Sequence, residues 1–427
     1  MINKLKNLTS ESSRLLESFS QFAILEGVKI YLVGGAVRDL MLGRKTFDLD
    51  IVVEGDAIKF AHKFAEKNKK KFKKHHAFGT ATVYFDSYHV DLVTARSETY
   101  AFSGALPKVS PASLKEDLFR RDFTINAMAV SLNQADYGKL VDFYGGEKDL
   151  KSGLVRVLHE KSFMDDPTRI LRAVRFEQRF SFKIERNTLR FLQQAVSCEA
   201  FDFVNPHRLR EDLIFILKEP EPYKYIARLS QLKALFFIDK KLQINKKDAL
   251  LFGRIDKAVC FYKKTFKFHR NLDEYILNLS AILIKLPKNK VAAFMETFGF
   301  KKGDRLRILA ICDNLAGAKK LNKKNLPHKI YQFLNPLSFE SIVFFYAYHN
   351  HKGIRKQIGF FLNHLSVMRL KLKGHDFRQM GFAPLTLYGK LFEKLLHVKM
   401  DKGLETVEEE AKAAKAIFKR LSRFKHC

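Results

Sequence analysis

Two acidic residues separated by one apolar residue lie within the stretch YLVGGAVRDLMLGRKTFDLDIVV at residues 31–53. They are Asp48 and Asp50, and the apolar, β-branched run at 47–53 predicts a strand around them. Because side chains alternate along a strand, both carboxylates would point to the same face. Like charges held this close repel each other unless a cation lies between them, and oxygen-only ligands suit Mg²⁺. The pattern therefore predicts a magnesium site; the alternative is a solvent-facing edge strand that carries two unrelated acids.

Two glycines, Gly34 and Gly35, precede these acids and follow a short apolar run at 31–33. A helix is expected over 36–42, so the glycines would form the turn between a strand and a helix. Such a turn suits phosphate, because glycine lets the backbone approach the anion and the helix start presents free N–H groups. Arg38 lies one helical turn further along and could add a charged fork to the same phosphate.

Phosphate at the glycine turn and metal at Asp48 and Asp50 form the arrangement that nucleotidyl transfer needs. Metal ions at such a site activate the attacking hydroxyl and neutralise charge on the triphosphate. A third carboxylate would complete a two-metal site. Asp91 in YHVDLVTAR is the candidate for this third catalytic acid, because it falls on an expected neighbouring strand. The alternative is an aspartate on the surface of that strand.

The elements that would position these residues lie in the first third of the chain. Short β-branched runs mix with helical stretches there, and the expected strands are 29–33, 47–53, 79–85, 88–95, 126–131 and 139–143. From about residue 151 onward helical periodicity dominates. The sequence therefore predicts an α+β fold, with a strand-containing head followed by an all-α remainder. The lysine cluster KNKKKFKK at 67–74 is interpreted as a solvated helix face.

Composition narrows the possible partners. The chain has 427 residues with 77 Lys and Arg against 46 Asp and Glu, and the net charge of +31 points to nucleic acid or an anionic membrane surface. The apolar run SIVFFYAY at 341–348 is far too short to span a membrane. The N-terminus lacks the apolar core of a signal peptide, so a cytoplasmic protein with no membrane partner is expected. Four cysteines form no CxxC pair, which argues against a zinc site or a disulfide framework.

Several stretches, in this order along the chain, resemble the motifs of class II tRNA nucleotidyltransferases and bacterial poly(A) polymerases. They are GGAVRD at 34–39, DLD at 48–50, SLKEDLFRRDFTINAMAV at 113–130, DDPTRILRAVRF at 165–176 and HRLREDL at 207–213. The resemblance implies a small mixed-sheet nucleotidyltransferase head at 1–150, then an all-α neck at 151–220, body at 221–325 and tail at 326–427. It also implies Mg²⁺ as cofactor, CTP and ATP as substrates, and the 3′ end of an RNA such as tRNA as acceptor.

Asp166 and Arg169 are three residues apart and would lie on adjacent turns of a helix. Cytosine and adenine each present an amine donor beside a ring-nitrogen acceptor, whereas uracil and guanine present the reverse. An acceptor carboxylate beside a donor guanidinium therefore matches C and A and clashes with U and G, at roughly 1–3 kcal/mol per unsatisfied group. Pro167 suits the first position of that helix with Asp166 as its N-cap, and capping is the alternative role of Asp166.

The resemblance also assigns nucleotide contacts to Arg172 and Arg175, which continue the three-residue spacing. At about 100° per residue, Arg175 falls on roughly the opposite side of the helix from Asp166. Arg172 could reach the triphosphate or support the pocket. The family has Glu where this chain has Asp165, and the shorter side chain would keep a supporting role.

Arg120 and Arg121 precede Asp122 and the apolar stretch FTINAMAV, which is expected to be a buried strand. Arginines at the mouth of a strand beside a phosphate site would neutralise triphosphate or hold ribose. All three residues are therefore predicted to belong to the nucleotide site; the alternative is a structural salt bridge between Arg121 and Asp122. Asn126 is expected to be structural. The segment ETYAFSGALPKVSPAS at 98–113 is expected to be a flexible loop that moves as specificity switches from C to A.

Together these features predict a Mg²⁺-dependent enzyme that adds C and A to the 3′ end of tRNA, as CCA. The same motifs serve enzymes that add only A, only CC or a poly(A) tail. Members of the resembled family that add only CC tend to have a shortened loop at 98–113, so the full-length segment here argues against CC-only addition. The retained acids argue against a catalytically idle RNA-binding protein. The long basic helical remainder argues against transfer to a small molecule or a protein, and LKGHDFRQMGFAP at 372–384 within it resembles the family's tail element.

Overall fold

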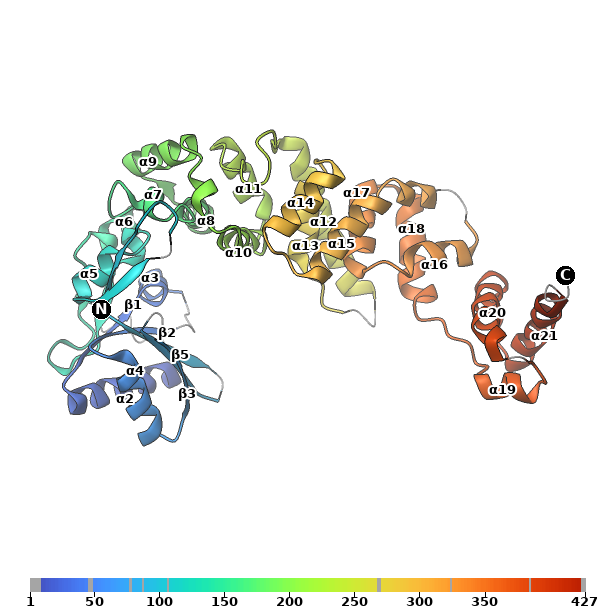
Figure 1. Ribbon diagram of the computed structural model, residues 1–427, viewed down its shortest axis with the longest axis horizontal. Coiled ribbons are helices and arrows are strands. Elements are labelled where there is room, and N and C mark those ends of the chain that lie inside the picture. The colour runs from blue at the N-terminus through green and yellow to red at the C-terminus, as the bar shows by residue number, and fades with distance from the viewer. Residues whose placement is uncertain are drawn as a thin grey trace. The chain divides into compact units, whose positions relative to one another are not determined.

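The computed structural model describes residues 9–44, 49–76, 79–86, 88–105, 107–266, 270–322, 325–383 and 385–423. The chain divides into two compact units. The first comprises Met1–Ile216 and Lys224–Lys241, and the second comprises Leu217–Tyr223 and Leu242–Cys427. The β-sheet belongs to the first unit, where it is drawn in blue and cyan in Figure 1.

The sheet of the first unit is mixed. The strands are Lys29–Val33 (β1), Leu49–Glu54 (β2), Lys71–His75 (β3), Thr80–Tyr84 (β4), His89–Thr94 (β5), Arg96–Thr99 (β6), Lys108–Pro111 (β7), Ala129–Ser131 (β8), Leu140–Val141 (β9), Leu154–Val155 (β10) and Lys183–Ile184 (β11). Among the described residues, seven of these strands form one sheet in the order β3-β4-β5-β2-β1-β8-β9. In it β2 and β5 run parallel and the other neighbours run antiparallel. The pairs β6–β7 and β10–β11 are separate from this sheet.

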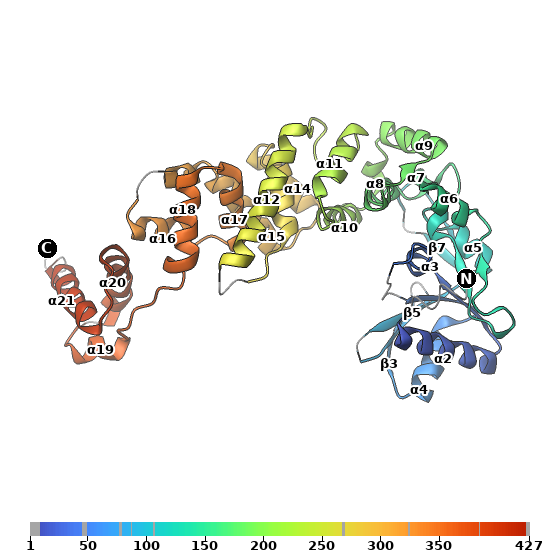
Figure 2. The ribbon, with the colours of Figure 1, turned by 180° about the vertical axis from the view of Figure 1, so that it is seen from behind.

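Helices cover both faces of the sheet. The helices up to residue 231 are Ser10–Glu26 (α2), Gly35–Met41 (α3), Ala57–Lys67 (α4), Leu114–Phe119 (α5), Gly146–Ser152 (α6), Ser162–Asp165 (α7), Arg169–Phe180 (α8), Arg186–Ser197 (α9), Pro206–Leu217 (α10) and Pro222–Gln231 (α11). Figures 1 and 2 show α2 and α4 on one face, where the Phe19 and Phe64 rings stack with centroids 4.0 Å apart. On the opposite face, Tyr31 and Val33 of β1 pack in one cluster with Leu118 of α5.

The regular elements in the described residues of the second unit are all helices. Its helices are Lys246–Thr265 (α12), Glu274–Leu283 (α13), Lys288–Thr297 (α14), Lys302–Asn314 (α15), Pro327–Leu334 (α16), Phe339–His349 (α17), Lys352–Phe360 (α18), Gly374–Gln379 (α19), Tyr388–Lys402 (α20) and Val407–Arg423 (α21). Phe377, in the stretch that resembles the family's tail element, is fully buried in a core with Leu391 and Leu395 of α20. Lys399 pairs with the buried Glu410 of α21. Over the described ranges, no helix has the length and apolar character needed to span a membrane.

The predicted fold class is confirmed, because a mixed sheet in the head is followed by helices. The interpretation of the lysine cluster at 67–74 is wrong in its second half. Residues 71–75 form β3, one of the two edge strands of the sheet, and its lysines are exposed. Lysines on an edge strand discourage pairing with another chain, which accounts for a strand of such low apolar content.

Two further expectations on either side of α5 are corrected. The segment at 98–113 is not simply a loop, because β6 and β7 pair antiparallel there and tie its ends together. Ser103 Oγ, near its tip, donates to the Met164 carbonyl at 2.6 Å. The buried strand expected in FTINAMAV is also shorter, since Thr124–Asn126 is a 3₁₀ turn and β8 begins at Ala129.

The start of α8 also differs from the expectation. The helix begins at Arg169 with Thr168 as N-cap, two residues later than Pro167. The backbone N–H groups of Arg169 and Ile170 donate three residues back, to the carbonyls of Asp166 and Pro167, so the preceding turn is of the 3₁₀ type. Asp166 Oδ1 still accepts from the backbone N–H of Thr168, at 3.2 Å, and so serves the turn from just outside the helix.

Candidate active site

The first unit contains a cavity of about 430 Å³ that collects most of the sequence-predicted residues. Its described lining is rich in arginine and also carries four acids. The lining residues are Gly34, Gly35, Arg38, Asp50, Glu98, Tyr100, Pro107, Arg120, Arg121, Asp122, Asn126, Asp166, Arg169, Arg172, Phe176 and Arg208. An arginine-lined hollow of this size suits a ligand that carries several negative charges.

The strand register brings two of the predicted metal-site acids together. Asp50 of β2 and Asp91 of β5 are direct partners across the parallel pair, so their side chains lie on the same face. Asp91 Oδ1 accepts from Thr82 Oγ1 at 2.6 Å. Asp48, the remaining acid predicted for the metal site, lies outside the described residues. Within the described ranges, no group of three His, Cys, Asp or Glu side chains is placed to hold a metal ion. Asp50 and Asp91 are a pair of neighbouring carboxylates, and carboxylate oxygens are the ligands that suit Mg²⁺.

The glycine turn lies against these acids. Gly34 has φ 70° and ψ −135°, a backbone conformation that other residues rarely adopt. A Cβ at this position would lie 2.9 Å from Arg121 Nη1 and 3.8 Å from Asp50 Oδ2. Gly35 begins α3 and also lines the cavity. The turn therefore places bare backbone between a carboxylate and a guanidinium.

Arg38 is buried in the cavity wall, and its guanidinium donates hydrogen bonds to protein groups. Its Nη1 donates to Asn126 Oδ1 at 2.6 Å, and its Nε donates to Asp39 Oδ1 at 2.9 Å. The guanidinium also lies over the rings of Phe176 and Phe180, at 5.1 and 4.9 Å from their centroids. These contacts give Arg38 a role in joining α3 to α8, beside its place at the cavity.

Arg120 and Arg121 are held from behind by one buried acid, Asp117. Arg120 Nη2 and Arg121 Nη2 donate to its two oxygens at 2.8 and 2.9 Å. Burial would raise the pKa of Asp117, but Arg121 and Arg120 outweigh it and hold the pKa below its usual range. Glu98 accepts from Arg120 Nη1 at 2.8 Å on the other side. Arg121 Nε is buried and has no hydrogen-bond partner among the residues that the structure describes.

The alternative pairing of Arg121 with Asp122 is not the one observed. Arg121 pairs with Asp117, while Asp122 Oδ2 lies 2.7 Å from Arg172 Nη2. Asp122 Oδ1 accepts from the Asn126 amide at 2.9 Å. Burial would raise the pKa of Asp122, but Arg172 and the hydrogen bonds from the Asn126 amide and the Phe123 backbone N–H keep the pKa below its usual value. Asp122 is therefore ionised near neutral pH.

The predicted base-reading pair lies in the cavity, and both members are held by protein groups. Asp166 Oδ2 accepts from Arg208 Nη2 at 2.8 Å. Arg169 Nη1 donates to Ser162 Oγ at 2.6 Å, and Arg169 Nη2 donates to the Arg120 carbonyl at 2.7 Å. An acceptor carboxylate and a donor guanidinium thus both line the cavity, each held by hydrogen bonds to protein groups.

Arg175 is placed differently from Arg172. It is absent from the described lining of the cavity. Its guanidinium lies over the Phe215 ring of α10, at 4.9 Å from the centroid. Arg172 lines the cavity through its ion pair with Asp122.

The acid Asp212 on α10 lies near this arginine cluster. Burial raises its pKa to about 6, although Arg172 acts in the opposite direction, and the neighbouring Asp166 raises the pKa further. A second carboxylate close to Asp166 therefore resists ionisation.

Sequence reasoning gave no role to several residues of this site. Asp117, Glu98 and Arg208 all hold predicted site residues through hydrogen bonds. Two of them lie inside quoted motifs, Asp117 in SLKEDLFRRD and Arg208 in HRLREDL. Their place inside these motifs could have identified them, because a charged residue within a matched motif is a candidate for contact with the site.

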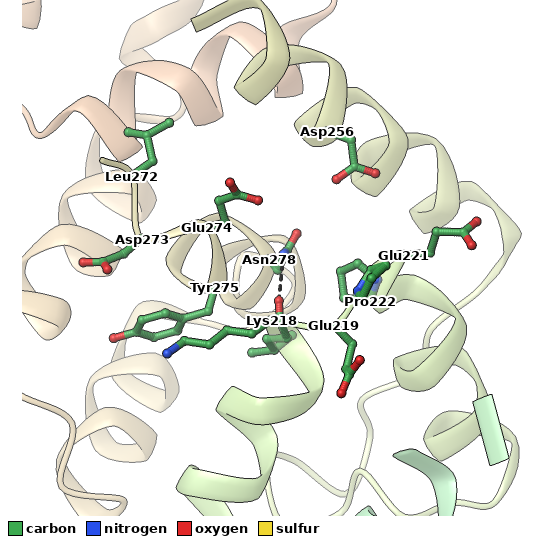
Figure 3. A pocket seen from close by; sticks show the side chains of 12 residues that line it. Lys218, Glu219, Glu221, Pro222, Asp256, Leu272, Asp273, Glu274, Tyr275 and Asn278 are labelled. Atoms are coloured by element: carbon green, nitrogen blue, oxygen red, sulfur yellow. Dashed lines mark hydrogen bonds between the residues drawn. The ribbon is translucent and has the colours of Figure 1, made fainter. Parts of the chain in front are cut away.

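The second unit has a larger hollow of about 580 Å³ with the opposite electrostatic character. Figure 3 shows the carboxylates that surround it, which are Glu219, Glu221, Asp256, Asp273 and Glu274. Burial raises the pKa of Asp256, with Glu274 and Glu221 adding to the effect. A triphosphate would be repelled by this lining, so the arginine-lined cavity of the first unit is the candidate site.

A mixed sheet with neighbouring carboxylates, a glycine turn and an arginine-lined cavity is the architecture of a nucleotidyltransferase head. A family model described as the Poly A polymerase head domain matches residues 30–156. An A-adding tRNA nucleotidyltransferase of Halalkalibacterium halodurans is 31% identical over 396 residues, which cover 91% of this chain and 88% of that protein. The chain belongs to this family of tRNA nucleotidyltransferases, which confirms the resemblance that the motifs indicated.

Longer relatives and solved structures agree with this membership. An A-adding tRNA nucleotidyltransferase of Geobacter sulfurreducens is 32% identical and matches 90% of this chain, which spans 44% of that relative's length. A CCA-adding enzyme in its apo form II matches with a TM-score of 0.83 and 32% identity, covering 97% of this chain and 98% of that one. A Thermotoga maritima CCA-adding enzyme complexed with tRNA matches with a TM-score of 0.77 and 31% identity, covering 97% of both chains.

Proposed function

We propose that this protein adds C and A nucleotides to the 3′ end of tRNA without a template, using CTP and ATP with Mg²⁺. The observation that carries the proposal is the cavity that joins Asp50, the Gly34 turn and the Asp166–Arg169 pair. One cavity is then surrounded by the proposed catalytic carboxylate, the glycine turn proposed to bind phosphate, and the two side chains proposed to read the base. In this scheme residues 1–150 form the catalytic head, 151–220 the neck that reads the base, 221–325 the body and 326–427 the RNA-binding tail.

Asp50 and Asp91, with Asp48, would hold Mg²⁺. The chemistry supplied by Mg²⁺ at these residues would be activation of the attacking 3′ hydroxyl of the RNA and neutralisation of charge on the triphosphate. The chain's own groups position the substrates. The Gly34 backbone admits the phosphates, and Arg120 and Arg121, fixed by Asp117, balance their charge.

Base selection follows from the order of acceptor and donor on one wall. Asp166 would accept from the exocyclic amine of cytosine or adenine, and Arg169 would donate to the neighbouring ring nitrogen. Uracil and guanine present a carbonyl and an N–H in these places, so both contacts would become repulsive. The bonds to Ser162 and Arg120 use two of the five N–H groups of the Arg169 guanidinium, so a donation to the base does not require either bond to break.

A narrower activity, addition of A alone, is the second candidate. It is favoured by the names of the relatives that match about nine-tenths of this chain, from Geobacter sulfurreducens and Halalkalibacterium halodurans, both A-adding tRNA nucleotidyltransferases. Solved structures of a CCA-adding enzyme with ATP and with CTP, each 31% identical with TM-scores of 0.79 and 0.78, keep the broader proposal first.

One assay separates these activities. The protein is incubated with Mg²⁺ and with CTP, ATP or both, on tRNAs that end at the discriminator base, at C or at CC, and the products are sequenced. The proposal predicts CCA on the shortest tRNA only when both nucleotides are present. Addition only to the tRNA ending in CC would identify the A-adding activity. A long A tract would identify a poly(A) polymerase, and no incorporation on any tRNA would overturn the proposed function.

A further inference from the structure

Arg208 of α10 lines the cavity and carries a hydrogen-bond donor, Nη1, to which the proposed function assigns no role. Its Nη2 donates to Asp166 Oδ2 at 2.8 Å, and the residue lines the cavity. Its Nη1 is buried and finds no hydrogen-bond partner in the part of the chain that the structure describes. An unpaired buried donor costs free energy, which an acceptor on a bound ligand would recover.

Asp166 determines which atom of a base Nη1 would meet. This inference rests on the proposed function, in which Asp166 accepts from the exocyclic amine of the base. Arg208 Nη2 donates to that same carboxylate, and Nη1 belongs to the same small guanidinium, so an acceptor atom next to the amine would lie within its reach. The ring nitrogen on one side of the amine is already assigned to Arg169. The atom on the other side therefore remains for Arg208.

The two permitted bases differ at that atom. In adenine the amine is flanked on its outer side by N7, which is an acceptor, whereas in cytosine the same place is a carbon that carries hydrogen. An acceptor and a donor read side by side at N6 and N7 form the pair of contacts that proteins use to recognise adenine. Guanine also has N7, but its carbonyl would face the Asp166 carboxylate and be repelled.

We propose that Arg208 Nη1 donates to N7 of the incoming adenine. Arg208 is then a specificity-determining residue that favours ATP over CTP, because CTP leaves its buried donor unpaired. Its second nitrogen meanwhile keeps Asp166 in place for either base. Arg208 would thus distinguish ATP from CTP, whereas Asp166 and Arg169 would reject UTP and GTP.

The test uses 7-deaza-ATP, in which a C–H replaces N7 and the rest of the base is unchanged. Binding of ATP and 7-deaza-ATP to the full chain is measured by calorimetry. We expect ATP to bind roughly ten- to hundredfold more tightly, the effect of one hydrogen bond from a charged donor. In Arg208→Lys the single ammonium can pair with Asp166 but offers no second nitrogen, so the ratio should fall to about one.

Arg210→Lys is the matched control, because Arg210 lies on the same helix and contacts His207 and Glu211. It should keep the wild-type ratio. Equal binding of the two nucleotides by the wild type would overturn the inference without any variant, and so would a ratio that survives Arg208→Lys. Failure of the proposed function is separately visible, as an absence of nucleotide incorporation into tRNA whatever the binding ratio.

Discussion

At the scale of single residues, the proposed base selection by Asp166 and Arg169 depends on the protein groups that fix their side chains. Arg208 fixes the carboxylate at 2.8 Å. The guanidinium is fixed by Ser162 Oγ and by the Arg120 carbonyl. Because rigid groups do not adapt to the wrong base, a mismatched base would leave them unpaired instead of being accommodated.

Arg169→Ala should therefore weaken base selection. We expect the preference for CTP and ATP over UTP and GTP to fall by about tenfold or more, since one donor to the base is lost. The measurement is kcat/KM for each of the four nucleotides on one tRNA. Arg179→Ala, an exposed arginine on the same helix, is the control. An unchanged preference in Arg169→Ala would remove this arginine from the base-reading role.

The raised pKa of Asp212 should make the stability of the folded protein depend on pH. Its pKa is raised from 3.8 to about 6 in the folded protein, so the folded state holds the proton more tightly than the unfolded chain. The contribution of Asp212 to stability is thus greatest below about pH 4 and falls as the pH rises to about 6. Asp212→Asn cannot ionise, so its Tm relative to the wild type should rise between pH 4 and 7 and then level off. A difference in Tm that does not vary with pH would contradict this account.

At the scale of elements, the turn between β1 and α3 depends on one glycine. Gly34→Ala would add a Cβ 2.9 Å from Arg121 Nη1, in a backbone conformation that disfavours side chains. Such strain costs about 1–3 kcal/mol, and we expect ATP affinity to fall by about tenfold or more because Arg121 must move. Gly43→Ala is the control, since Gly43 also has positive φ but nothing lies within 4 Å of its Cβ.

Binding of ATP by both variants can be measured by calorimetry. The turn has its proposed role if Gly34→Ala loses affinity and Gly43→Ala keeps it. Equal affinity in the two variants would show that the glycine turn does not shape the nucleotide site.

Elements with strong local signals could be predicted from the sequence. The apolar run at 29–33 forms β1 with those bounds, and the glycines form the turn after it. β3 was not predicted, because its lysines mask the alternation and its pairing with β4 is a property of the sheet. The β6–β7 ribbon was not predicted either, because its short strands have mixed polarity.

The positioning residues of the site could not be found from local patterns. Arg208 meets Asp166 across 42 residues of sequence, and Arg120 meets Glu98 across 22. Such partners are determined by how elements pack, and spacing along the chain does not reveal them. The motif at 165–176 indicated the pair that we propose reads the base, because Asp166 and Arg169 are only three residues apart in the chain.

At the scale of the whole molecule, the charge of +31 predicts a strong dependence of tRNA binding on salt. Each phosphate that meets a Lys or Arg releases counterions when the complex forms. We expect tRNA affinity to fall about tenfold or more between 50 and 200 mM salt, which corresponds to two or more phosphate contacts. Filter binding or fluorescence anisotropy measures this directly. Affinity that does not vary with salt would contradict a role for the basic surface in RNA binding.

The central claim is that Asp50 belongs to the metal site of nucleotide addition, and Asp50→Asn tests it most directly. The measurement is single-turnover incorporation of AMP, from ATP with release of pyrophosphate, into tRNA ending in CC, together with tRNA affinity. We predict that incorporation slows by about a thousandfold, since metal stabilisation of the reacting groups contributes several kcal/mol, while tRNA affinity is kept. Asp56→Asn, at the exposed N-cap of α4 where Asn caps equally well, should behave as the wild type. Incorporation by Asp50→Asn at the wild-type rate would contradict the account.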